Sequence, residues 1–112
     1  YVSAHGTATD KGDIIESRAT HDVLGKNVPI SALKSYTGHT LGACGSLEAW
    51  VTLNMMREGW FHPTVNLDNV DERCAELDYI TGPGRQMICD IAMSNNFAFG
   101  GINTSLIFKR YN

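Results

Sequence analysis

The distribution of hydrophobic residues predicts strands and helices in alternation. Apolar runs at Tyr1–Ala4 and Val28–Leu33 are typical of buried strands. Between them, apolar residues recur near helical spacing as far as Gly25, a residue type that commonly ends helices. We expect Asp10 or Asp13 to cap the start of this helix, because short polar side chains satisfy the free N–H groups there.

The next segment is apolar on most of its surface. Leu47–Arg57 is typical of a buried helix, and we expect a loop over Lys34–Gly42 before it and an extended connector around Pro63 after it. A chain of 112 residues contains too little protein to cover such a helix on every side. The chain also starts in a strand without a methionine, so we expect it to be part of a larger protein.

Three further strands are expected at Asp78–Ile80, Met87–Met93 and Thr104–Phe108. The last two are joined through Asn95–Asn103, in which Gly100–Gly101 is a hairpin signal. The pattern therefore predicts an α/β fold with an antiparallel strand pair at its C-terminal end.

Composition narrows the class of protein. Apolar residues make up 43% and charged residues 19%, as in globular proteins, and the net charge of −3 excludes a strongly basic nucleic-acid surface. No apolar run approaches the roughly 18 residues that cross a bilayer. The three cysteines are widely spaced and form no disulfide pattern, which favours a reducing compartment and a cytoplasmic location.

Two histidines are the main candidates for chemistry. His5 and His39 each follow a strand and stand next to glycine, and ligands of α/β sheets usually bind at such strand ends. Two imidazoles at one site could donate two hydrogen bonds to an oxyanion. The alternative is that both are structural loop residues. A zinc site with Cys44 has no ligand spacing to support it, so no metal site is expected, and His21 and His62 are assigned no role.

Lys34 is a further candidate, because a lysine at the end of an apolar strand needs a carboxylate or lies exposed. The carboxylates that could meet it are Asp13, Glu16 and Glu48. Cys44 lacks the strand-to-helix glycine pattern of a nucleophile and is expected to be buried as a small residue.

Hydroxyl and aromatic residues complete the candidate set. Thr7 and Thr9 either bind a polar ligand or close their turn. Phe97 and Phe99 beside Gly100–Gly101 either border a pocket on a movable loop or plug a tight hairpin.

Three ordered motifs together resemble the C-terminal half of β-ketoacyl-acyl-carrier-protein synthases, the elongating Cys-His-His condensing enzymes of the thiolase superfamily. The motifs are Ala4–Thr9 with Gly12–Asp13, Lys34–His39 with Gly42–Ala43 and Gly45, and Asn95–Asn103. The resemblance implies the C-terminal half of a thiolase-like fold, with a mixed β-sheet and packed helices, as one ketoacyl-synthase domain over residues 1–112. The nucleophilic cysteine of the family belongs to an N-terminal half that this sequence does not contain, so the isolated chain is expected to be inactive.

The resemblance also implies an activity, namely decarboxylative condensation of malonyl-acyl-carrier protein with an acyl-enzyme thioester. The implied roles are catalysis for His5 and His39, pantetheine binding for Thr7 and Thr9, and acyl-pocket gating for Phe99 with Phe97, Gly100 and Gly101. Lys34 has an implied structural role with Glu48 as its acidic partner, and Asp13 and Glu16 are expected close by in support. The implied partners are acyl carrier protein with its phosphopantetheine arm, acyl and malonyl thioesters, the N-terminal half and a second copy. No separate cofactor, nucleic acid or membrane is expected.

The sequence departs from the family at a few positions. Asn96 and Ala98 replace the usual serine and glycine, and Cys44 stands where relatives usually have alanine. These departures suggest a specialised pathway, such as a polyketide or aryl-polyene pathway. A non-catalytic partner subunit of a ketosynthase heterodimer is the alternative, against which the retention of both His5 and His39 argues.

Overall fold

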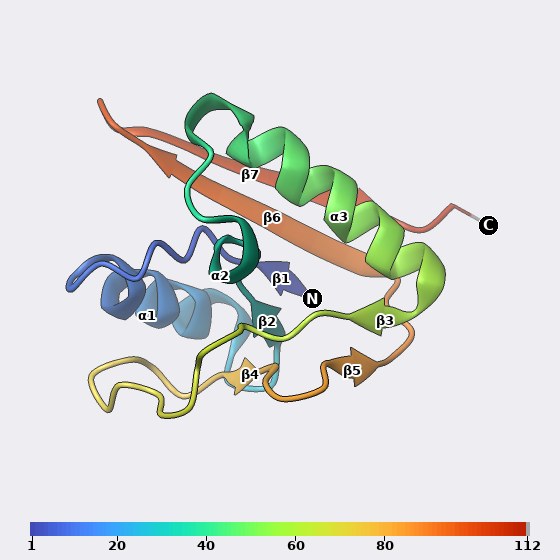
Figure 1. Cartoon of the computed structure of the whole chain (residues 1–112), viewed down its shortest axis with the longest axis horizontal. Coiled ribbons are helices and arrows are strands. Elements are labelled where there is room, and N and C mark those ends of the chain that lie inside the picture. The colour runs from blue at the N-terminus through green and yellow to red at the C-terminus, as the bar shows by residue number, and fades with distance from the viewer. Residues whose placement is uncertain (112) are drawn as a thin grey trace.

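The computed structural model describes residues 1–111 as one α/β unit built on a mixed sheet (Figure 1). Its elements in chain order are β1 (Val2–Ser3), α1 (Gly12–Leu24), β2 (Pro29–Ser31), α2 (Lys34–Thr37), the 3₁₀ turn η1 (Leu41–Ala43), α3 (Cys44–Glu58), β3 (Trp60–Phe61), β4 (Asp78–Tyr79), β5 (Arg85–Gln86), β6 (Ile91–Ala98) and β7 (Ile102–Lys109).

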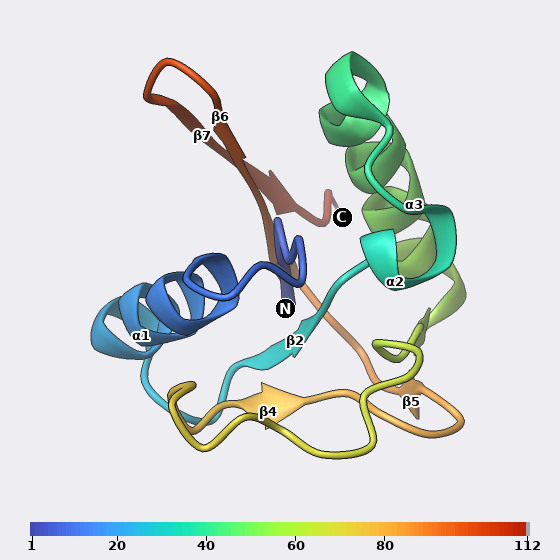
Figure 2. The same cartoon turned by 60° about the vertical axis from the view of Figure 1, so that its left-hand side comes forward.

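The main sheet has the strand order β4-β2-β1-β6-β7. Strand β1 pairs in parallel with both β2 and β6, β4 pairs in parallel with β2, and β7 pairs antiparallel with β6. Figure 2 shows α1 and α3 on opposite sides of the strands. The expected α/β class, mixed sheet and C-terminal antiparallel pair are therefore confirmed. A small second sheet, β3 with β5, was not expected from the sequence.

The core follows the alternation of side chains along the strands. One cluster packs under α3 and is made by Tyr1, Met55, Met56, Phe61, Ile80, Cys89 and Ala92. The other cluster contains alternate positions along the chain, Val2 of β1 with Ala4 just after it and Ile30 of β2 with Ala32 just after it, together with Leu77. Helix α1 buries the polar residues Glu16, Ser17 and Thr20. Its buried face thus carries hydrogen-bonding groups and not an apolar stripe.

Several expected boundaries were wrong. No side chain caps α1, which begins after Lys11; the Thr9 hydroxyl accepts the Gly12 N–H at 3.2 Å, and the Asp13 carboxylate accepts the Ala8 N–H at 3.3 Å. The turn before the helix uses these groups, so neither Asp10 nor Asp13 caps it.

The expected loop over residues 34–42 contains the one-turn helix α2 and the turn η1, and α3 begins at Cys44 and not at Leu47. The start of α3 was not predicted because it consists of glycines and small residues, which do not show the apolar spacing of a helix. Strands β6 and β7 together extend further into the glycine motif than expected, so only Phe99, Gly100 and Gly101 form the turn. Both glycines have positive φ, at 84° and 78°, which allows this short connection.

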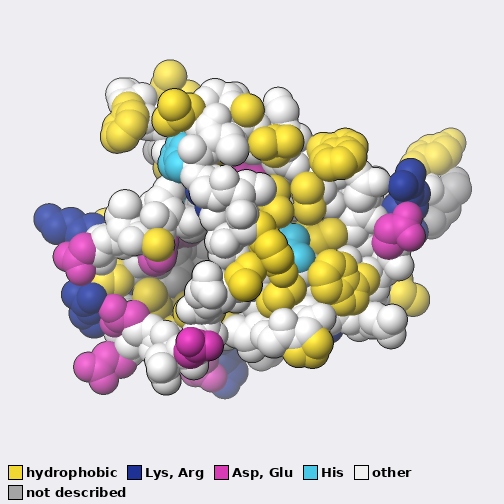
Figure 3. Space-filling model, viewed as in Figure 1, with side chains coloured by type: hydrophobic (Ala, Val, Ile, Leu, Met, Phe, Trp, Pro, Cys, Tyr) yellow, Lys and Arg dark blue, Asp and Glu magenta, His cyan; other side chains and the backbone are white. Residues whose placement is uncertain are grey.

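Helix α3 is covered on one side only. Its buried residues include Glu48, Thr52, Met55 and Met56, whereas Trp50 on the other side is 65% exposed. In Figure 3 apolar side chains occupy the middle of the visible face, and charged side chains gather toward its two ends. The helix is apolar on most of its surface, as expected, and within residues 1–111 only part of that surface is buried.

Candidate active site

The loop after β1 places His5. Glu16 of α1 holds this loop, because its two carboxylate oxygens accept the backbone N–H groups of His5 at 2.7 Å and Gly6 at 2.8 Å. Burial raises the pKa of Glu16, while the two backbone donors favour its charged form. At Gly6 φ is 44°, and a Cβ atom would lie 2.6 Å from Cβ of Ala32. The loop therefore requires glycine there and is fixed against α1.

The turn after α2 places His39. Gly38, with φ of 69°, ends α2, and the chain then folds back through Leu41, whose φ of 56° is unusual for a residue with a side chain. This fold points the Leu41 N–H at the ring of His39, whose Nδ1 accepts it at 3.0 Å. The backbone thus orients the imidazole.

The two rings meet from neighbouring loops. The ring centroids of His5 and His39 lie 5.7 Å apart with their planes at 90°. Phe97 of β6 packs against His5 on another side, with centroids 5.6 Å apart. The expectation that both histidines lie at one edge of the sheet is confirmed.

A buried ion pair supports His5. Nζ of Lys34 lies 2.5 Å from Oε1 of Glu48 and 3.3 Å from Nδ1 of His5. The side chains of Lys34 and Glu48 are 5% and 2% exposed. Of the three carboxylates considered from sequence, Glu48 is therefore the partner of Lys34; Asp13 and Glu16 bind backbone N–H groups instead.

These contacts fix which nitrogen of each ring carries the proton. An ammonium group and a backbone N–H can only donate, so Nδ1 accepts a hydrogen bond in both His5 and His39. Nε2 then holds the proton of each neutral ring and is the atom available to a ligand. Burial is the main cause that lowers the pKa of His5, and the positive charge of Lys34 lowers it further. The ring is therefore neutral at neutral pH.

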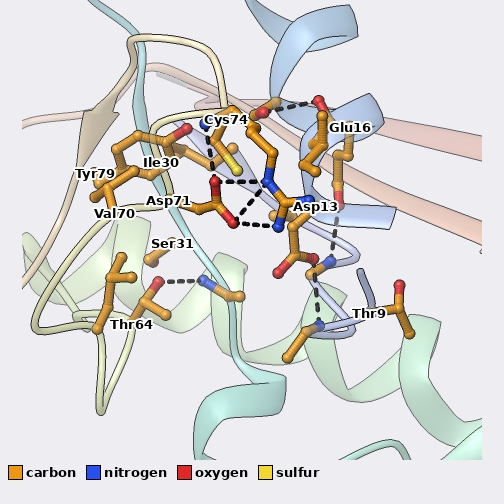
Figure 4. A pocket seen from close by; sticks show the side chains of 18 of the residues that line it. Thr9, Asp13, Glu16, Ile30, Ser31, Thr64, Val70, Asp71, Cys74 and Tyr79 are labelled. Atoms are coloured by element: carbon orange, nitrogen blue, oxygen red, sulfur yellow. Dashed lines mark hydrogen bonds and ion pairs between the residues drawn. The ribbon is translucent and has the colours of Figure 1, made fainter. Parts of the chain in front are cut away.

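Two cavities border this region. One, of about 370 Å³, is lined by Thr7, Lys34 and His39 together with Ser35 and Asn66. The other, of about 340 Å³, lies between α1, β2 and the segment after Thr64 (Figure 4). Thr9 lines the second cavity, which neither His5 nor His39 lines. The two threonine hydroxyls nevertheless lie 3.1 Å apart, at the junction of these spaces.

The residues expected to form a gate lie further out. Phe99 is 98% exposed at the tip of the β6–β7 hairpin, next to Gly100 and Gly101. Phe97 is the aromatic residue of this motif that contacts His5. The structure thus unites one of the two phenylalanines with the histidines and leaves the other in solvent.

Sequence reasoning missed two side chains around the site. Cys44 is buried as expected, but its Sγ lies 3.4 Å from Nδ1 of His39. Asn96, noted only as a departure from the family, partly opposes the lowering of the His5 pKa. His62 does lie in the loop after β3, as expected, and is buried against Tyr36 at a centroid distance of 5.5 Å. For Cys44 the spacing of five residues from His39 is the only signal in the sequence, and it becomes meaningful once α3 is known to begin there.

Two negative findings hold for residues 1–111. No group of three or more His, Cys, Asp or Glu side chains is arranged to hold a metal ion. None of the helices in that range combines the length and the apolar character needed to cross a membrane.

Comparison with known proteins identifies the family. Residues 1–68 match the family described as "Beta-ketoacyl synthase, C-terminal domain". A 3-oxoacyl-[acyl-carrier-protein] synthase 2 from Synechocystis sp. is 46% identical over 99% of this chain, which spans 27% of that relative.

Solved structures agree. A β-ketoacyl synthase from Burkholderia phymatum STM815 is 62% identical with a TM-score of 0.98, and the alignment covers 100% of this chain and 28% of that one. A type II polyketide ketosynthase, solved with its acyl-carrier protein and bound to the hexaketide, is 35% identical with a TM-score of 0.93 over 99% of this chain and 28% of that one. The chain has the thiolase-like fold of these ketosynthases and belongs to the family of β-ketoacyl synthase C-terminal domains.

Proposed function

We propose that this chain forms the decarboxylation side of the active site of a 3-oxoacyl-[acyl-carrier-protein] synthase. The observation that carries the proposal is the pair of imidazoles, 5.7 Å apart, whose Nδ1 atoms both accept hydrogen bonds. Two neutral rings so held present Nε2–H donors to one small region, as the stabilisation of an oxyanion requires. The naming of the relatives and the motifs around both histidines support this reading.

The reaction follows from these donors. As malonyl thioester loses CO₂, the electrons of the breaking C–C bond form an enolate, whose charge collects on the thioester oxygen. Nε2–H of His5 and of His39 stabilise that oxygen. The enolate carbon then attacks an acyl thioester on a cysteine supplied by the N-terminal half. A C–C bond forms, and the C–S bond breaks to release the thiolate.

The remaining residues have supporting roles in this proposal. Lys34 with Glu48, and Glu16 with Asp13, hold the loop and ring of His5. Thr7 and Thr9 bind the pantetheine arm where the two cavities meet. Phe97, Phe99, Gly100 and Gly101 border the acyl pocket.

The proposed partners follow from the same assignment. Acyl carrier protein delivers the acyl and malonyl groups, in line with the solved polyketide ketosynthase bound to such a carrier. The N-terminal half of the protein covers the exposed side of α3 around Trp50. The complete enzyme is a cytoplasmic homodimer and needs no cofactor beyond the phosphopantetheine of its carrier.

The test separates the two half-reactions in the full-length protein. We expect His5→Ala and His39→Ala each to slow the decarboxylation of malonyl-acyl-carrier protein by about 10²–10³-fold and to slow acylation of the cysteine much less. His21→Ala, on the solvent side of α1, is the matched control and should leave both rates unchanged.

Other outcomes contradict the proposal in different ways. Equal loss of both half-reactions would make the histidines structural. Absence of decarboxylation in the unmutated full-length protein would favour a non-catalytic partner subunit.

A further inference from the structure

Cys44 lies directly behind one of the two histidines. It is the first residue of α3 and is 5% exposed. Its Sγ lies 3.4 Å from Nδ1 of His39, the nitrogen on the side of the ring opposite Nε2. The thiol therefore faces the back of the imidazole and not the position that an oxyanion would take.

The surrounding groups set the direction of this contact. The Thr40 hydroxyl donates to Sγ of Cys44 at 3.4 Å, so the sulfur accepts one hydrogen bond. Nδ1 of His39 already accepts the Leu41 N–H and has no proton of its own to give in the neutral ring. The S–H of Cys44 is then left to donate to Nδ1, where it shares the one lone pair with the Leu41 N–H as a second and weaker donor. This contact completes a chain from the Thr40 hydroxyl through the thiol to the imidazole.

We propose that Cys44 is a positioning residue for His39, acting as a second donor that keeps the proton of this ring on Nε2 and holds the ring toward the substrate. The inference rests on the proposed function, because it assigns Cys44 a part in decarboxylation through His39. It gives the thiol no covalent role, since the sulfur is buried and directed at a ring nitrogen.

Replacing Cys44 by alanine and by serine distinguishes two possible roles of the thiol. A thiol held only by packing would be replaced well by alanine and poorly by the more polar serine, because a buried hydroxyl needs partners. A thiol that acts as a donor would be replaced better by serine, which keeps a donor at nearly the same place. The order of the two variants therefore distinguishes donation from space filling.

The experiment uses the full-length protein and measures malonyl-acyl-carrier-protein decarboxylation and cysteine acylation separately. We expect Cys44→Ala to slow decarboxylation about threefold to tenfold, the effect of losing one modest hydrogen bond, with acylation nearly unchanged. We expect Cys44→Ser to restore most of the lost rate. Cys89→Ala, at a buried cysteine in the core cluster under α3 that lines neither cavity, is the matched control, and its decarboxylation and acylation rates should match those of the unmutated protein.

The outcomes are separable from those of the proposed function. If the unmutated protein does not decarboxylate malonyl-acyl-carrier protein, the proposed function fails. If it does so and the alanine variant matches it, or the serine variant is slower than the alanine variant while thermal unfolding shows both folded, the role of Cys44 as a donor is overturned.

Discussion

The histidine centre, which is formed by His5 and His39, and the tip of the β6–β7 hairpin both lie in motifs that resemble those of β-ketoacyl synthases, but they are held in different ways. Around His5 and His39, side chains of α1, α2 and α3 hold the loop and ring of His5 and contact Nδ1 of His39, which also accepts the backbone N–H of Leu41. At the hairpin tip, Phe99 is 98% exposed and lies between Ala98 and two positive-φ glycines.

The difference fits the roles in the proposed function. Donors to an oxyanion must not move during the reaction, and the contacts of this chain hold both histidines in place. A gate must move, and its closed position depends on a surface that it touches when closed. Within residues 1–111 the two histidines are therefore held by many contacts, whereas Phe99 at the hairpin tip is not packed.

The largest expected effect breaks the buried support of the centre. Lys34→Met leaves the carboxylate of Glu48 buried without its cation, and we expect a loss of about 3–5 kcal/mol in the unfolding free energy of the full-length protein. Lys26→Met removes a lysine from an exposed pair with Glu76, 3.9 Å apart, and should cost less than about 1 kcal/mol. Denaturant unfolding measures both, and equal losses would contradict the distinction between the two sites.

A smaller effect appears on acidification. Burial lowers the pKa of His62, whose Nδ1 donates to the Pro63 carbonyl at 2.9 Å. Below about pH 6.5 the unfolded chain takes up a proton here while the folded chain resists it, so the unfolding free energy falls until the pH passes the lower folded pKa. The depressed pKa of His5 acts in the same direction. The hairpin tip does not contribute to this loss through titration of its own groups, because residues 91–108 contain no titratable side chain.

We expect His62→Asn, which keeps a donor near the position of Nδ1, to reduce this acid loss by up to about 1 kcal/mol. Unfolding free energies measured from pH 7.5 to pH 5 provide the comparison. Gln86→Asn, at an exposed position of β5 without a titratable side chain, is the control and should keep the slope of the unmutated protein. An unchanged slope in the His62 variant would show that its protonation is not linked to folding.

The smallest effect on stability, and the sharpest on specificity, is expected at the hairpin. Ala98 ends β6, and alanine resists the left-handed backbone that glycine adopts freely. Ala98→Gly should lower the unfolding free energy by less than about 1 kcal/mol while changing the ratio of acylation rates for short and long acyl chains. Rates with a series of acyl carrier proteins test this, and an unchanged ratio would make Ala98 a neutral replacement.

How far sequence reasoning reached varies with the kind of feature. Apolar runs placed the strands that are buried in the sheet, and Gly25 marked the end of α1 as expected. Spacing failed at α2 and at the start of α3, because Gly42, Ala43 and Gly45 carry no apolar signal. It also missed β3 and β5, because Arg85–Gln86 contains no apolar residue and Trp60–Phe61 stands in the short stretch between the end of α3 and Pro63.

The sequence by itself determined the fold class, the two histidines and the expectation that they meet, because parallel strands end at a common edge and His5 and His39 each follow one. Residue types alone left three carboxylates open for Lys34, and the family resemblance favoured Glu48 among them. The tertiary structure pairs Lys34 with Glu48 by bringing α3 over α2, places Glu16 under the backbone of His5, and sets Cys44 behind His39. These contacts depend on distances between elements, which periodicity and motif spacing do not encode.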